Sequence, residues 1–119
     1  MSFAIACAQS HVFRAIAPMS GAIWSGCDES DKANIGPIAM WQSHGNNDGT
    51  VSLSAGKQAR DFILKRNGCG TQTKPVDPSP CVEYQGCEEG YPVIYCEFNG
   101  GHEQPNFATN AIWKFFSQF

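Results

Sequence analysis

The sequence lacks several features that would assign it to whole classes of protein. No apolar run approaches the ~20 residues that a membrane-spanning helix needs. A net charge of −3 gives no electrostatic basis for binding nucleic acid or an anionic membrane. The first residues show no basic segment followed by an apolar stretch and a cleavage site, so we expect no secretion signal in them. What remains is an acidic chain of 119 residues, long enough for one domain.

Two chemical signatures are missing as well. There is no Gly-x-Ser-x-Gly, the sharp strand-to-helix turn on which many hydrolases present a serine nucleophile. The intervals between Cys81, Cys87 and Cys96 do not match zinc-ligand pairs, and His44 and His102 belong to no pattern of paired cysteines. We therefore expect no metal site.

Cysteine, in contrast, is abundant, with six residues in the chain. Disulfides formed in an oxidising, extracellular compartment are the favoured interpretation, and scattered buried thiols are the alternative. If strands at 81–84 and 92–98 form an antiparallel hairpin, Cys81 and Cys96 fall nearly opposite, with Cα atoms about 5.5 Å apart. The main rival joins Cys69 to Cys96 and Cys81 to Cys87, because six cysteines allow about 15 connectivities.

The distribution of apolar residues and helix breakers predicts alternating strands and helices. The segment 37–43 is almost continuously apolar, as central parallel strands are. The fold class is therefore α/β, with a mostly parallel sheet and flanking helices. We expect helices at 2–9, 53–66 and 107–118, strands at 13–19, 37–43, 81–84 and 92–98, and loops at 20–36 and 70–80.

Two loop motifs carry the chemistry. Ser43-His44-Gly45-Asn46-Asn47-Asp48 and Asn99-Gly100-Gly101-His102 each follow a predicted strand and precede a predicted helix. Asp48 alone fits a simple Asx turn, and His102 alone fits an exposed loop histidine. Together, in the order acid then histidine, they match the acid and general base of a hydrolytic triad. We expect Asp48 to hydrogen-bond His102 Nδ1, and His44 to help shape the acid loop.

With these motifs the chain resembles the C-terminal half of the feruloyl esterase family, secreted α/β-hydrolases related to polyhydroxybutyrate depolymerases. The resemblance covers nearly the whole chain. It rests on Phe13-Arg14-Ala15-Ile16-Ala17-Pro18-Met19-Ser20-Gly21-Ala22, His44-Gly45-Asn46-Asn47-Asp48, Ala59-Arg60-Asp61, Asn67-Gly68-Cys69, Tyr84-Gln85-Gly86-Cys87, Tyr91-Pro92-Val93, Gly100-Gly101-His102 and the segment 113–119.

The resemblance implies a partial α/β-hydrolase domain over 1–119 that is extracellular and uses no cofactor. It implies cleavage of hydroxycinnamate esters of plant cell-wall arabinoxylan, with Asp48 and His102 as catalytic residues and a Cys69–Cys87 disulfide. Cys7 and Cys27 are left to pair with each other or with partners elsewhere. The family's nucleophile elbow would lie about five residues before Met1, in an absent N-terminal half. We expect the chain alone to be inactive, with that half as its partner.

Trp24 is a candidate for the substrate pocket, because a tryptophan in a glycine-flanked loop at the catalytic edge supplies a flat apolar wall. The alternative is a lid residue that folds onto the core. Two other functions stay open. One is an acetyl-type esterase of the same architecture, in which Trp24 and 25–35 make a smaller pocket. The other is a non-catalytic carbohydrate-binding module, with Trp24, Trp41 and Tyr91 as a sugar platform and an all-β fold.

Overall fold

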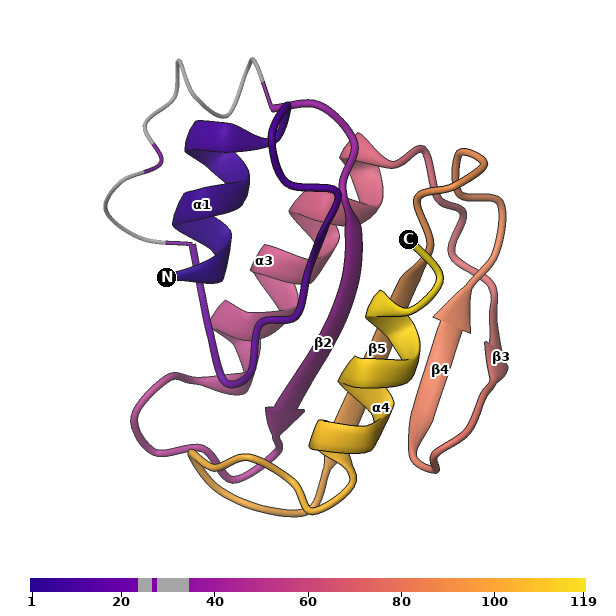
Figure 1. Ribbon diagram of the computed structural model, residues 1–119. Helices are drawn as coiled ribbons and strands as arrows, with labels where there is room; N and C mark the ends of the chain where they lie inside the picture. Colours follow the sequence, from indigo (N-terminus) through magenta and orange to yellow (C-terminus); the bar gives the residue numbers. More distant parts are fainter. Residues whose placement is uncertain (24–26, 28–34) are drawn as a thin grey trace.

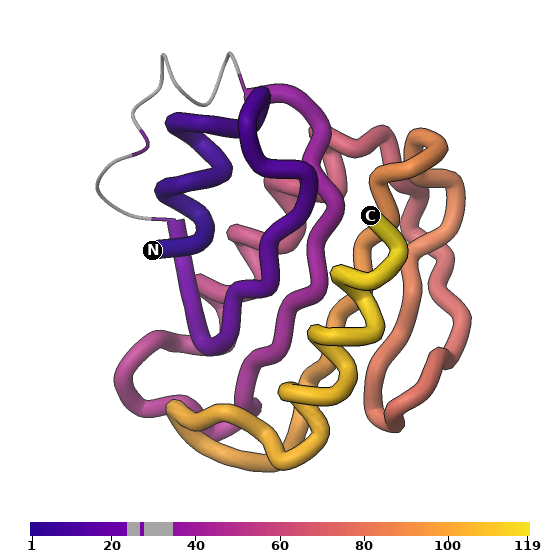
Figure 2. The backbone as a smooth tube through the Cα atoms, in the orientation of Figure 1, coloured from indigo at the N-terminus to yellow at the C-terminus, as the bar shows by residue number. Residues whose placement is uncertain are grey.

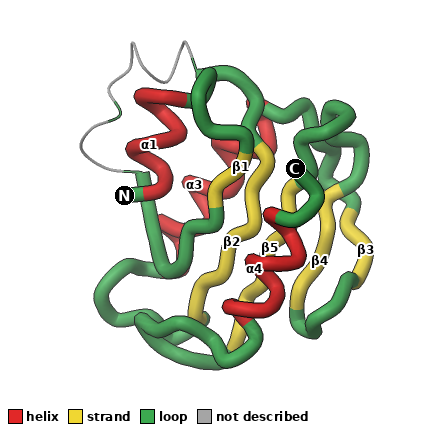
Figure 3. The backbone as a smooth tube through the Cα atoms, in the orientation of Figure 1, coloured by secondary structure: helices red, strands yellow, loops and turns green. Residues whose placement is uncertain are grey.

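The computed structural model describes residues 1–23, 27 and 35–119, which form a five-stranded mixed sheet with helices on both faces (Figure 1). The strands follow the order β1-β2-β5-β4-β3 across the sheet (Figure 3). The elements are α1 (Ser2–Gln9), β1 (Ala15–Ile16), β2 (Ala39–Gly45), α3 (Leu53–Arg66), β3 (Thr73–Pro75), β4 (Cys81–Tyr84), β5 (Val93–Phe98) and α4 (Ala108–Phe116).

The sheet combines a parallel and an antiparallel half. β1 pairs with β2 and β2 with β5 in parallel, whereas β4 pairs antiparallel with both β5 and β3. The sequence predicted a mostly parallel sheet. The short segment 85–92 explains why β4 and β5 are antiparallel, because a parallel pair needs a crossover connection of about a dozen residues or more.

The core consists of two apolar layers, one on each face of the sheet. Met40 of β2 packs with the layer beneath α1 and α3, and its neighbour Trp41 packs with the layer beneath α4. This alternation follows from the two-residue period of a strand. Every residue of β2 is buried, as expected for a central strand that is covered on both faces.

Helix α3 spans the predicted residues because both of its ends carry clear signals. The Ser52 side chain accepts a hydrogen bond from the Ala55 N–H and caps the first turn. At the other end Gly68 adopts φ +67°, a left-handed conformation that closes many helices. The side chain of the buried Asn67 then hydrogen-bonds the Ile38 backbone N–H and C=O, which ties the end of α3 to the start of β2.

Strands β1 and β3 differ most from the prediction, and β2 begins and ends two residues later than predicted. β1 covers Ala15–Ile16 rather than 13–19, because Pro18 has no N–H to continue the ladder; pairing resumes as a single bridge between Met19 and Ser43. β3 was predicted as loop. Its residues are all exposed and include a proline, so it carries no alternating apolar pattern, and an edge strand tolerates both features.

The disulfides in the described residues join Cys7 to Cys27, Cys69 to Cys87, and Cys81 to Cys96. The second and third pairs are those predicted, and the rival connectivity is wrong. Cys81 and Cys96 face each other in the β4–β5 register with Cα atoms 4.1 Å apart, closer than the expected distance.

The Cys81–Cys96 bridge is expected to be a main support of the hairpin. Replacing both cysteines with alanine should lower the free energy of unfolding by about 3 kcal/mol, because the bridge closes a loop of 15 residues in the unfolded chain. Urea unfolding under non-reducing conditions would measure the loss. Wild type with all three disulfides intact, measured under the same non-reducing conditions, is the reference, and an unchanged urea midpoint would contradict the prediction.

Candidate active site

The two motif loops lie side by side at the carboxyl ends of β2 and β5, where parallel α/β sheets place their ligands (Figure 2). Backbone hydrogen bonds join them: the Asn46 N–H donates to the Phe98 carbonyl and the Asn47 N–H to the Gly100 carbonyl, each at 2.9 Å. The parallel register of β2 and β5 therefore sets the distance between the acid loop and the histidine loop.

Gly45 permits this close approach. A Cβ atom at this position would lie 2.2 Å from the Gly101 carbonyl oxygen and 2.4 Å from that of Gly100, distances that no side chain can occupy. The glycine at the end of β2 is thus required by the neighbouring loop, not by its own backbone angles.

Asp48 and His102 form the expected hydrogen bond. His102 Nδ1 lies 2.9 Å from Asp48 Oδ2, and the carboxylate side chain is fully buried while the imidazole is 45% exposed. Because Nδ1 donates to the carboxylate, Nε2 is the ring nitrogen left to face a reacting group. This is the orientation in which a histidine accepts a proton from a nucleophile.

The carboxylate is held in its ionised form. Burial alone would raise the pKa of Asp48. The N–H groups of Val51 and Thr50, each 2.8 Å from Oδ1, and the hydrogen bond from His102 outweigh burial, so the pKa lies below its ordinary value. An ionised acid beside Nδ1 stabilises the imidazolium that forms when His102 takes up a proton.

His44 lies closer to this chemistry than the sequence indicated. Its ring is fully buried, with Nε2 2.9 Å from the Val51 carbonyl oxygen and 3.4 Å from Asp48 Oδ2. The sequence feature that could have indicated this position of His44 is the polar run Gln42-Ser43-His44 at the end of a strand that is otherwise apolar and wholly buried.

A hollow of about 330 Å³ opens beside His102. Its walls include Thr50 and Val51 of the acid loop, Ser20, and Ser2 at the start of α1. Ser20 was not singled out from the sequence. It is buried and adopts φ +53°, which is uncommon for a residue other than glycine.

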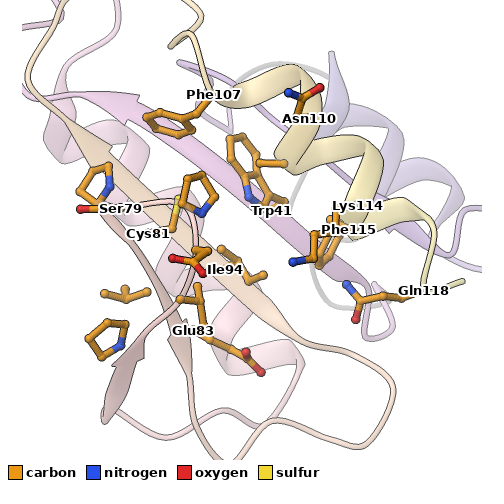
Figure 4. A pocket seen from close by; sticks show the side chains of 17 residues that line it. Trp41, Ser79, Cys81, Glu83, Ile94, Phe107, Asn110, Lys114, Phe115 and Gln118 are labelled. Carbon is orange, nitrogen blue, oxygen red and sulfur yellow. The ribbon is translucent and has the colours of Figure 1, made fainter.

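A larger hollow of about 880 Å³ lies elsewhere, between α4 and the β3–β4 hairpin (Figure 4). Neither Asp48 nor His102 lines it. Trp41 does, yet that side chain is only 1% exposed and so offers no face for a sugar to stack on. Together with α3 and α4, this burial argues against the carbohydrate-binding module and its all-β fold.

Trp24 lies outside the described residues, so its place near the pocket stays a prediction. Among the residues that the structure does describe, no group of three or more His, Cys, Asp or Glu is arranged to hold a metal ion. In that same part of the chain, no helix is long and apolar enough to cross a bilayer.

The arrangement of strands and helices is that of part of an α/β-hydrolase. A variant of Arabidopsis thaliana SOBER1 superposes on 98% of the chain with a TM-score of 0.58 and 18% identity, and 48% of that structure is covered. An identity this low establishes the fold and not the function. The predicted fold class is confirmed.

Curated proteins with similar sequences indicate an enzyme family, which the structural likeness alone does not. Feruloyl esterase D of Neurospora crassa is 36% identical over 132 residues, covering 100% of this chain and 44% of the esterase. Feruloyl esterase C of Emericella nidulans is 32% identical over 127 residues, covering 98% and 45%. No protein-family model matches. The predicted resemblance to feruloyl esterases is confirmed, and the chain spans less than half the length of these relatives.

Proposed function

We propose that this chain supplies the acid and the general base of a serine carboxylic ester hydrolase. The observation that carries the proposal is the hydrogen bond between Asp48 and His102 Nδ1, which leaves Nε2 to serve a nucleophile. The hollow beside His102 shares its wall with the start of α1, so a serine placed just ahead of that helix would lie within reach of the imidazole.

The proposed reaction has two balanced halves. The serine oxygen attacks the ester carbonyl while its proton moves to His102 Nε2, and the resulting imidazolium returns that proton to the departing alcohol. Water then attacks the acyl-enzyme in the same way, releasing the acid and restoring the serine. Asp48 remains ionised throughout and stabilises each imidazolium.

The serine is proposed to come from a second segment of an α/β-hydrolase. The chain has no Gly-x-Ser-x-Gly, and its relatives are more than twice as long as the part it matches. β1 lies at the end of the strand order, so it offers an edge for a further strand. Large exposed apolar side chains just before β1, those of Val12 and Phe13, suit an interface with such a segment.

The proposed substrates are hydroxycinnamate esters of plant cell-wall arabinoxylan, and the proposed location is extracellular. The names of the relatives support the acyl group, since they are feruloyl esterases. The three disulfides in the described residues support an oxidising compartment.

The decisive experiment compares the isolated chain with a completed enzyme. We define the latter as this chain joined to the part of Neurospora crassa feruloyl esterase D that it does not match. Methyl ferulate should be hydrolysed only by the completed enzyme, because the isolated chain lacks the nucleophile and the oxyanion hole. A fluorophosphonate should label the completed enzyme alone.

Ser2 is the informative control, because it lines the same hollow as His102. Labelling of the isolated chain that disappears in Ser2→Ala would show that a nucleophile is already present and would overturn the need for a second segment. A completed enzyme that is folded, with its disulfides formed, yet hydrolyses no ester would overturn the proposed function.

Trp24 is proposed to form a wall of the hydroxycinnamoyl pocket. In the completed enzyme, Trp24→Ala should reduce kcat/KM for methyl ferulate far more than for a small acetyl ester, by about 1–3 kcal/mol of differential transition-state binding. Trp113→Ala, an exposed tryptophan on α4, is the matched control. Equal losses on both esters would favour a purely structural Trp24, and a preference for the acetyl ester in the unmodified enzyme would favour the acetyl-type alternative.

A further inference from the structure

His44 is a fully buried polar side chain inside the candidate site, and the reaction proposed above does not use it as an acid or a base. Its Nε2 lies 2.9 Å from the Val51 carbonyl oxygen, which can only accept a hydrogen bond. Nε2 must therefore carry a hydrogen. Nδ1 is buried and has no hydrogen-bond partner among the described residues, so a proton there would be a buried donor with nothing in them to bind. The contacts thus select the tautomer with the hydrogen on Nε2.

The same N–H edge faces the catalytic carboxylate. His44 Nε2 lies 3.4 Å from Asp48 Oδ2, the oxygen that also accepts the hydrogen bond from His102. The other oxygen, Oδ1, is occupied by the backbone N–H groups of Thr50 and Val51. We infer that His44 is a positioning residue: anchored by Val51, it presents a polar N–H to Oδ2 and keeps that oxygen directed at His102.

Gly56 on α3 leaves the space that the His44 imidazole occupies. A Cβ atom at position 56 would lie 2.3 Å from His44 Nδ1 and 2.6 Å from Cε1, so only glycine leaves room for the ring. Glycine is a poor helix former, and this one is buried inside α3. The packing of His44 explains its presence there.

The inference rests on the proposed function for its catalytic meaning, but it can be tested on the chain as it is. Nitrogen-15 NMR of the histidine rings at about pH 8, where an ordinary imidazole is neutral, reports which nitrogen carries the hydrogen. We expect His44 with its hydrogen on Nε2 and His102 with its hydrogen on Nδ1. Finding His44 with the hydrogen on Nδ1, or as an imidazolium, would overturn the inference.

A matched pair of variants separates the N–H group from simple bulk. In His44→Gln the amide nitrogen can stand where Nε2 stood, whereas His44→Leu fills the space without a donor. We expect His102 to keep its Nδ1 hydrogen in the first variant and to lose that preference in the second. Disulfide mapping and circular dichroism confirm that both are folded. If His102 keeps its Nδ1 hydrogen in His44→Leu, or loses it equally in both folded variants, the positioning role of His44 is contradicted.

Gly56→Ala provides a second variant that leaves His44 chemically intact. Alanine favours a helix over glycine, yet its methyl group should displace the ring and disturb His102 as His44→Leu does. Gly49→Ala is the control, because a Cβ there meets no atom within 4 Å.

In the completed enzyme, His44→Leu should lower kcat about 10²-fold with KM unchanged, the pattern of lost positioning. If NMR contradicts the hydrogen positions expected for His44 and His102, the inference about His44 fails but the esterase proposal stands. If the completed enzyme is inactive, the esterase proposal fails but the hydrogen positions found by NMR are unaffected.

Discussion

His102→Ala in the completed enzyme is expected to reduce kcat for methyl ferulate by about 10⁴–10⁶-fold while leaving KM nearly unchanged. The residue both removes the serine proton and returns it to the leaving group, so both halves of the reaction lose their proton carrier. Binding does not depend on that transfer, because the remaining walls of the hollow are intact. Steady-state kinetics on methyl ferulate, with fluorophosphonate labelling of the serine, would measure the loss.

The control for this variant is His11→Ala, an exposed histidine in the turn that follows α1. It should retain the kinetics of the unmodified completed enzyme. A His102→Ala enzyme that kept a near-normal kcat would remove His102 from the reaction, and the Asp48–His102 pair would then be a structural contact only.

The second large effect is expected for Asp48→Asn, which should lower kcat about 10⁴-fold. The backbone N–H groups of Thr50 and Val51 require an oxygen at the position of Oδ1, so the new amide NH2 must take the place of Oδ2. That NH2 group faces His102 Nδ1, which must then become an acceptor. The ring hydrogen moves to Nε2, where the base needs a lone pair.

The same substitution should alter the dependence of stability on pH. The folded state lowers the pKa of Asp48, so the carboxylate stabilises the fold above its ordinary pKa, and this contribution is lost as the pH falls through the folded value. Wild-type Tm should therefore drop more steeply than that of Asp48→Asn as the pH falls from about pH 5 through the lowered pKa of Asp48. Asp61→Asn, at an exposed position on α3, is the matched control for both experiments. Parallel Tm curves for Asp48→Asn and wild type would contradict the assigned cause.

Local signals in the sequence were sufficient for much of the fold. The helix 53–66 was predicted at the bounds that α3 has, because its apolar residues recur at helical spacing and Gly68 follows its end in the sequence. The Cys81–Cys96 bridge followed from a hairpin register that depends on neighbouring residues alone. β1 and β3 escaped correct prediction because one is interrupted by a proline and the other exposes every side chain.

The candidate site, like the fold, was predicted in part from the sequence and decided in part by the tertiary structure. The residue types, their glycine-bounded loops and their order along the chain point to Asp48 and His102 from the sequence alone. Only the tertiary structure brought the acid and the histidine within 2.9 Å of each other, because the parallel register of β2 and β5 and the space at Gly45 are contacts between distant segments. The burial of His44 against Gly56 was likewise decided by packing, which no local pattern encodes.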